Sequence, residues 1–170
     1  MYIPFNELPA NSRIWIYQSN RQLTPAEKQK ASAILKDFCE NWAAHNVQLK
    51  TSFSIEYDQF IILATDEDYH QPSGCSIDTS VRTLKELQAG LGIDLFDRTR
   101  VAFLVDGNVV THPLARLKAI FESGELGSGS LTFDNLVPSR GDLGSRWTTP
   151  VEKTWLVKYL PNSALASESR

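Results

Sequence analysis

The run Phe60–Ala64 is apolar at every position. Successive side chains of a strand point to opposite faces of the sheet, so this run predicts a strand that is buried on both faces. Such a strand needs a paired neighbour and a covering layer on each of its two faces. The chain must therefore fold into a sheet that has this segment among its inner strands.

Three further segments have the character of strands. Arg13–Gln18 is rich in β-branched and aromatic residues, and Val101–Val105 is apolar on both faces, so both predict inner strands. Thr51–Tyr57 alternates apolar and polar residues, which predicts a half-exposed strand at the edge of the sheet. Asp106–Asn108 predicts a hairpin turn that adds a fifth strand outside the strand before it.

Two helices are predicted between these strands. Thr24 and Glu27 form a capping box around a proline, which starts a helix with an apolar stripe. A second apolar stripe follows Ser76, the expected N-cap, with Asp78 as the second choice, and Gly92 supplies the left-handed stop. Further helices are expected after Pro113 and from a second capping pattern, Thr149–Glu152.

The order of the first six elements is β-α-β-β-α-β, the split order of ferredoxin-like domains. We therefore expect an α+β fold with a ferredoxin-like core, in which the first strand lies between the third and the fourth. The added hairpin strand widens this sheet, and the C-terminal helices cover its second face with Trp147 and Trp155. Residues 1–160 are predicted to form a single domain, followed by a polar, disordered tail over 161–170.

Composition narrows the possible environment and partners. The chain has 170 residues and a net charge of -3, which argues against a nucleic-acid partner. Its 2 cysteines provide no disulfide framework and favour a reducing compartment. The first residues lack the basic start and apolar run of a signal peptide, and no stretch is long enough to span a membrane. We expect a cytoplasmic, soluble protein.

The turn before the second helix contains the candidate catalytic residues. Cys75 lies where the helix should begin, and the dipole there favours a thiolate. His70 could act as its base, with Asp68 orienting the imidazole. The alternative, which is more frequent for cysteine, is that Cys75 packs as a small residue while Gly74 supplies an unusual backbone angle. Cys39 is expected to be a small core residue.

The same region suggests two other kinds of site. The amides of Gly74, Cys75, Ser76 and Ile77 could bind an anion at the helix start, although the carboxylate of Asp78 works against a phosphate. The acidic stretch 66–70 could supply oxygen ligands to Mg²⁺ or Ca²⁺. Its spacing matches no familiar metal loop, so a solvated acidic loop is favoured. We expect no metal and no cofactor.

The segments Tyr17–Arg21, Gly74–Asp78 and Leu95–Arg98 together resemble a family of small uncharacterised bacterial proteins. The resemblance extends from residue 1 to about residue 160. Members often carry the label "ABC transporter ATPase", but this sequence contains neither a Walker A loop nor a signature motif. The resemblance implies a bacterial, cytosolic origin and brings no assigned catalytic residues.

Three functions follow from these observations. The first is a non-catalytic binding or interaction domain whose partner is an unknown protein or small molecule, because no complete catalytic constellation is present. The second is a thiol-dependent enzyme or redox sensor that uses Cys75 with His70. The third is the binding of a nucleotide or another anion at the 74–78 turn. The sequence does not predict an oligomeric state.

Overall fold

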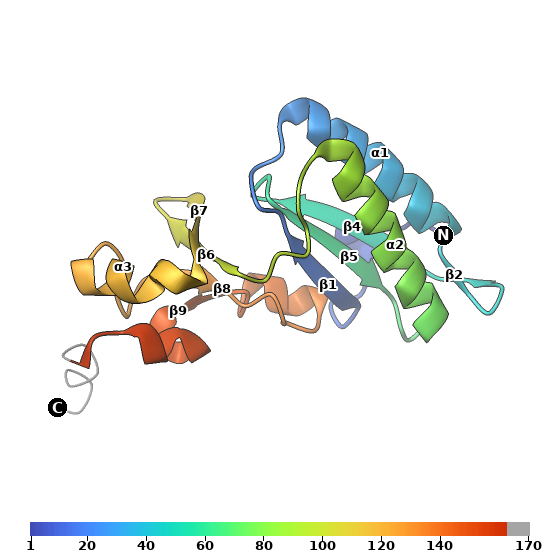
Figure 1. Ribbon diagram of the computed structural model, residues 1–170. Coiled ribbons are helices and arrows are strands. Elements are labelled where there is room, and N and C mark those ends of the chain that lie inside the picture. Colours follow the sequence, from blue (N-terminus) through green and yellow to red (C-terminus); the bar gives the residue numbers. More distant parts are fainter. Residues whose placement is uncertain (163–170) are drawn as a thin grey trace. The chain divides into compact units, whose positions relative to one another are not determined.

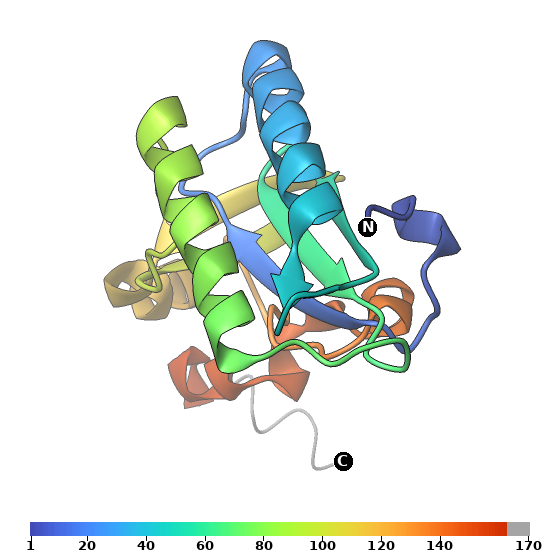
Figure 2. The same cartoon turned by 90° about the vertical axis from the view of Figure 1, so that its right-hand side faces the viewer.

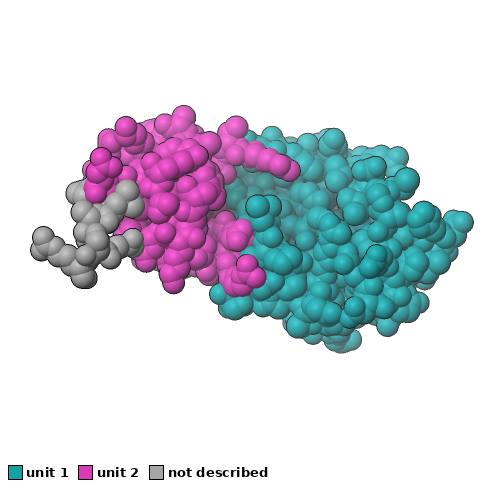
Figure 3. Space-filling view, turned by 90° about the horizontal axis from the view of Figure 1, so that it is seen from below, with its two compact units in different colours: residues 1–97, 135–145 teal, residues 98–134, 146–170 magenta. Residues whose placement is uncertain are grey.

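A computed structural model describes residues 1–162 and divides into two compact units, which are coloured separately in Figure 3. The first unit contains Met1–Asp97 and Asn135–Ser145, and the second contains Arg98–Asp134 and the chain from Arg146 onward. The prediction of a single domain over 1–160 stays a prediction, and most of the expected tail, residues 163–170, lies outside the described residues.

The first unit is built around strand β5 (Phe60–Thr65), and all six of its residues are buried. β5 pairs antiparallel with β1 (Arg13–Gln18) on one side and with β4 (Thr51–Glu56) on the other. The resulting order β1-β5-β4 confirms the order predicted for the first three strands, with Phe60–Ala64 inside the sheet and β4 at its edge. The alternation predicted for β4 is wrong, because Ser52 is buried and Tyr57 lies exposed in the turn after the strand.

Helices α1 (Pro25–Asn41) and α2 (Gly74–Leu91) lie side by side on one face of this sheet (Figures 1 and 2). Ile61 and Leu63 of β5 belong to the same core as the inner faces of both helices. The most deeply buried helical members of that core are Ala31, Leu35, Cys39 and Leu84. Burial of one leucine side chain stabilises the fold by about 1.5–3 kcal/mol, so this layer supplies much of the stability of the unit.

The helix boundaries partly follow the predictions. The capping box of Thr24 and Glu27 at the start of α1 is present, and Gly92 ends α2 with a φ of 63°. Asn46 is left-handed, with a φ of 64°, and lies beyond the end of α1. It lies with His45 in the turn of a small hairpin formed by β2 (Ala43–Ala44) and β3 (Val47–Gln48).

The second unit contains a four-stranded antiparallel sheet of order β7-β6-β8-β9. Its strands are β6 (Arg100–Val105), β7 (Asn108–Pro113), β8 (Leu131–Phe133) and β9 (Thr148–Pro150). The hairpin between β6 and β7 was predicted and turns at two residues of positive φ, Asp106 and Gly107.

The predicted ferredoxin-like sheet is not formed, because β6 pairs with β7 and β8 and not with β1. The outer edge of β1 is already occupied by the segment 135–139. Ile14 donates its amide to the carbonyl of Pro138 at 3.1 Å, and Arg13 forms a bridge with Ser139. The fold is therefore α+β, with its strands divided between separate sheets.

The end of the described chain also departs from the sequence prediction. Thr149 lies in β9 and caps no helix, and the expected final helix is replaced by two short 3-10 helices, η4 (Val151–Lys153) and η5 (Trp155–Tyr159). Thr154 separates the two and caps η5 by accepting a hydrogen bond from Leu156. The prediction that C-terminal helices cover the first sheet concerns both units and stays a prediction.

The remaining short elements complete the two units. Helix α3 (Leu117–Ser123) and the 3-10 turn η2 (Leu114–Arg116) belong to the second unit, and η1 (Phe5–Glu7) and η3 (Arg140–Gly144) belong to the first. The core of the second unit consists of Phe103, Leu117, Ile120, Phe121, Leu126, Val151, Leu156 and Leu160. The 3-10 turns at the C-terminal end of the described chain are thus anchored to β6 and α3.

The outer strands are partly closed by other groups. Thr51 at the start of β4 donates its amide to the carbonyl of Met1 and accepts a hydrogen bond from the amide of Ile3. The guanidinium of Arg100, on β6, donates to the carbonyl of Thr111, on β7, at 3.2 Å. Free strand edges template unwanted pairing, and these contacts shorten the open lengths of both edges.

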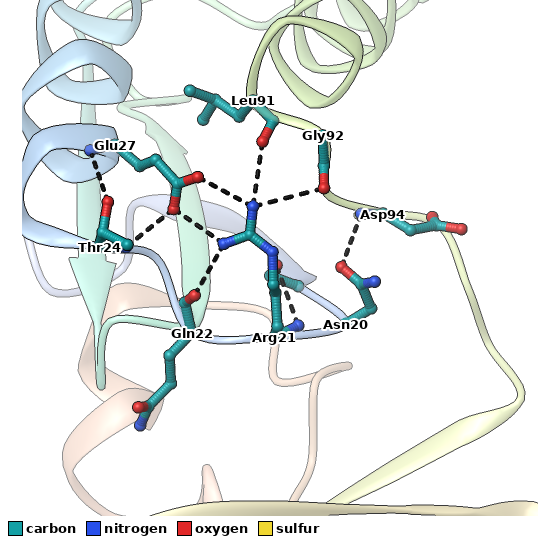
Figure 4. A network of polar contacts seen from close by, with 9 residues as sticks. Asn20, Arg21, Gln22, Thr24, Glu27, Leu91, Gly92 and Asp94 are labelled. Atoms are coloured by element: carbon teal, nitrogen blue, oxygen red, sulfur yellow. Dashed lines mark hydrogen bonds and ion pairs between the residues drawn. The ribbon is translucent and has the colours of Figure 1, made fainter.

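Arg21 fastens the start of α1 to the end of α2 (Figure 4). Its two terminal nitrogens donate to the carboxylate of Glu27 at 2.8 and 2.9 Å. One of them also donates to the carbonyls of Leu91 and Gly92 at 3.1 and 3.4 Å. The hydrogen bonds from Arg21, followed by that from the amide of Thr24, lower the pKa of Glu27 from 4.5 to about 2.

This lowered pKa predicts a defined dependence of stability on pH. Ionised Glu27 stabilises the folded state above about pH 4.5, and this contribution is lost as the pH falls towards about 2. We expect the melting temperature of Glu27→Gln to fall less steeply across this interval than that of the wild type. Thermal unfolding followed by circular dichroism at a series of pH values measures the difference.

The control is Glu86→Gln, which changes an exposed glutamate of α2. This variant should keep the wild-type slope. If Glu27→Gln and the wild type lose stability in parallel over the same interval, the contact between Arg21 and Glu27 does not contribute as described.

Candidate functional site

Helix α2 begins earlier than the sequence suggested. Its N-cap is Ser73, whose hydroxyl accepts from the amide of Ser76 at 3.2 Å, while the hydroxyl of Ser76 accepts from the amide of Ser73 at 2.8 Å. The expected N-caps, Ser76 and Asp78, are therefore wrong, because serine here takes the place that glutamate usually has in a capping box. Gly74 lies in the first helical turn and does not have the unusual backbone angle that was expected.

The acidic loop before α2 is held by its own side chains. Asp66 accepts from the amides of Asp68 and Tyr69 at 3.1 and 3.3 Å. Glu67 forms an ion pair with Arg13 at 3.2 Å, and Asp68 accepts from the side chain of Asn11 at 2.7 Å. Within residues 1–162, no group of three or more His, Cys, Asp or Glu side chains could hold a metal ion.

The structure does not connect the three predicted catalytic side chains by hydrogen bonds. Cys75 is a free, exposed thiol. The Nε2 atom of His70 is buried and has no hydrogen-bond partner among the described residues, and the carboxylate of Asp68 binds Asn11. The backbone amide of His70 donates to the carbonyl of Asp66, which fixes the loop. A catalytic role for Cys75 stays a prediction.

The predicted anion site has fewer available amides than expected. The amide of Ser76 is occupied by the hydroxyl of Ser73, and that of Ile77 donates to the carbonyl of Ser73. The amides of Gly74 and Cys75, in the first turn of α2, are the two that no side chain caps. Anion binding at this turn therefore stays a prediction that depends on these two groups.

The contacts at the two ends of α2 show which residues lie near Cys75. The indole of Trp42 donates to the carbonyl of Ser76 at 2.9 Å, which brings the end of α1 next to the start of α2. Arg21 binds the other end of α2, and 18 helical residues span about 27 Å, so Arg21 and Cys75 cannot share a site. Cys39 is fully buried, and burial raises the pKa of its thiol to about 12.

A second candidate surface lies on η5, where the sequence predicted burial. Trp155 is 57% exposed, and its ring meets that of Tyr159 edge to face with centroids 6.1 Å apart. The ammonium of Lys158 lies 5.3 Å from the first ring and 5.2 Å from the second. We call Lys153, Trp155, Lys158 and Tyr159 the Trp155 surface.

Sequence reasoning missed this surface because it assumed α-helical spacing. A stripe through Val151, Trp155 and Tyr159 is buried only if the segment is a continuous α-helix. With the break at Thr154 and the tighter 3-10 turns, Val151 stays buried, and Leu156 and Leu160 are buried in place of Trp155. The proline at position 150 and the threonine at 154 are the signals that could have indicated such a break.

Neither models of protein families, nor curated proteins, nor solved structures give a match to this chain. The resemblance to a bacterial family, inferred from short motifs, therefore stays a prediction. Within residues 1–162, no helix has the length and apolar character that crossing a bilayer requires.

The observed N-cap leads to a stability prediction. Ser73→Ala removes the hydroxyl that caps α2 and should lower the free energy of unfolding by about 1 kcal/mol. Asp78→Ala is the matched control, because Asp78 is exposed and lies beyond the first turn. Urea unfolding measures both variants, and a larger loss for Asp78→Ala than for Ser73→Ala would contradict the observed helix start.

Proposed function

We propose that the protein is a binding module that recognises a partner through the Trp155 surface and does not transform it. The observation that supports this proposal is the 57% exposure of Trp155 within an ordered turn. Exposed tryptophan is uncommon because burial of its large apolar ring stabilises the folded protein. Tryptophan and tyrosine are also enriched among the residues that dominate binding energy at protein interfaces.

The turn that carries Trp155 is held in place before any partner binds. Leu156 and Leu160 are anchored in the core of the second unit, and Thr154 accepts from the amide of Leu156 at 3.1 Å. The hydroxyl of Thr154 also donates to the carbonyl of Val151 at 2.8 Å. A preorganised aromatic anchor loses little conformational entropy on binding, which favours a recognition role.

Both cysteines are free thiols, which supports the further proposal that the module works in the reducing cytoplasm. Cys39 is fully buried and Cys75 is exposed. An exposed free thiol is easily oxidised or linked to another molecule outside a reducing compartment. This compartment is compatible with a partner that is a cytoplasmic protein.

Selection of peptides from a random display library tests the proposed function. We expect peptides that bind the wild-type protein and bind Trp155→Ala at least about tenfold more weakly. Tyr69→Ala is the matched control, because Tyr69 is 47% exposed and lies under the ammonium of Lys50 at 4.4 Å in the first unit. Isothermal titration calorimetry measures the affinities of the selected, synthesised peptides.

The binding proposal is contradicted if the selection yields no peptide or if the selected peptides bind Trp155→Ala as tightly as the wild type. Misfolding does not confuse the result, because substitution of an exposed residue usually changes the free energy of unfolding by no more than about 0.5 kcal/mol. The melting temperature of each variant checks this point.

A second candidate function is thiol chemistry at Cys75. The exposure of its sulfur in the first turn of α2, next to two uncapped amides, favours it over a purely structural role. The disulfide reagent DTNB should modify one thiol per folded chain, because Cys39 is buried, and both thiols in denaturant.

The variant His70→Ala tests whether the imidazole of His70 acts as a base for this thiol. His70→Ala should leave the pH dependence of the Cys75 reaction unchanged, because the structure shows no hydrogen bond from its imidazole. A shift of that pH profile in His70→Ala would support a thiol and imidazole pair, and it would favour the enzymatic candidate over the binding module.

A further inference from the structure

The Trp155 surface combines aromatic rings with positively charged lysine side chains. Lys153 and Lys158 are both exposed, and neither forms an ion pair with any residue that the structure describes. Between Val151 and Tyr159 the chain contains one acidic residue, Glu152, which is half-buried. The surface therefore presents positive charge to which an anionic group of a ligand can bind.

The position of Lys158 fixes where that anionic group can bind. Its ammonium lies over two rings, at 5.3 Å from Trp155 and 5.2 Å from Tyr159, where the negative faces of the rings attract it. Neither ring forms a hydrogen bond of normal strength with this ammonium, so its N–H groups can still donate to an acceptor on a ligand. A carboxylate can thus bind Lys158 while a neighbouring apolar group packs against the exposed indole.

We propose that the ligand of the Trp155 surface is an acidic peptide segment in which Asp or Glu residues lie next to an apolar or aromatic side chain. This inference rests on the proposed function and specifies the partner. The apolar part is required because an exposed ion pair alone contributes little in water. The acidic part is required because the ammonium of Lys158, next to the indole, would be desolvated without compensation under an uncharged peptide.

Two other anionic partners fit the structure less well. A membrane surface is bound by long amphipathic helices, whereas η5 has 5 residues and a single exposed tryptophan. Nucleic acid requires a broad basic face, and the net charge of the chain is -3. Both are included below as competing outcomes.

Three short synthetic peptides of equal length test the inference. The first contains Glu and Asp around one Phe, the second has Gln and Asn in place of the acids, and the third has Ser in place of the Phe. Fluorescence anisotropy with the wild-type protein should show at least about tenfold tighter binding of the first than of either other peptide. The preference over the neutral peptide should shrink at least about threefold between about 50 and about 300 mM salt, since salt screens exposed charges.

Variants of both units locate the site. Lys158→Met should remove the preference for the acidic peptide, and Trp155→Ala should weaken binding of every peptide. Lys50→Met and Tyr69→Ala alter the corresponding pair of a cation and an exposed aromatic ring in the first unit and should leave both effects unchanged. A single-stranded oligonucleotide and vesicles rich in anionic lipid are titrated in parallel.

The possible outcomes separate this inference from the proposed function. If the neutral peptide binds as tightly as the acidic one and its binding still depends on Trp155, the acidic partner is wrong and the binding module stands. If no peptide from this set or from the display selection binds, the binding module itself is wrong. If the oligonucleotide or the vesicles bind more tightly than the acidic peptide and need Trp155, the partner is not a peptide.

Discussion

The burial of β5 is the constraint on which the rest of the first unit depends. Its six residues are buried on both faces, so a strand must pair with each edge and a layer must cover each side. β1 and β4 meet the first requirement, and α1 and α2 cover the face that contains Ile61 and Leu63. Because both helices lie on the same face, their ends must be fixed relative to each other.

Hydrogen bonds from Arg21 hold α1 and α2 together at one end of the helix pair, and a hydrogen bond from Trp42 holds them together at the other end. Arg21 offers several donors in a planar fork, so one side chain can bind a carboxylate and two helix-terminal carbonyls together. The indole of Trp42 donates across to the first turn of α2. Arg21 is the last residue of the motif Tyr17–Arg21, on which part of the family resemblance rests, and these contacts give it a structural role.

Sequence patterns predicted local structure better than strand partners. The apolar run Phe60–Ala64 and the capping box at Thr24 depend on neighbours in sequence, and both appear in the structure. The partners of β6 are β7 and β8, and the sequence pattern of β6 itself does not indicate β8. The segment 135–139, which has no strand-like pattern, occupies the outer edge of β1, and no periodicity along the chain indicates it.

At the candidate sites, too, the sequence did not predict which side chains contact each other. Proximity in sequence suggested that Asp68, His70 and Cys75 act together, yet Asp68 binds Asn11, which is far away in the sequence. An acidic loop has many possible partners, and the geometry of the turn selects among them. At Trp155 the error came from helix type, because a 3-10 turn has 3 residues per turn and moves a tryptophan from the buried side to the exposed side. Surfaces on short 3-10 segments therefore have to be found in three dimensions, where exposure and neighbouring charge can be seen together.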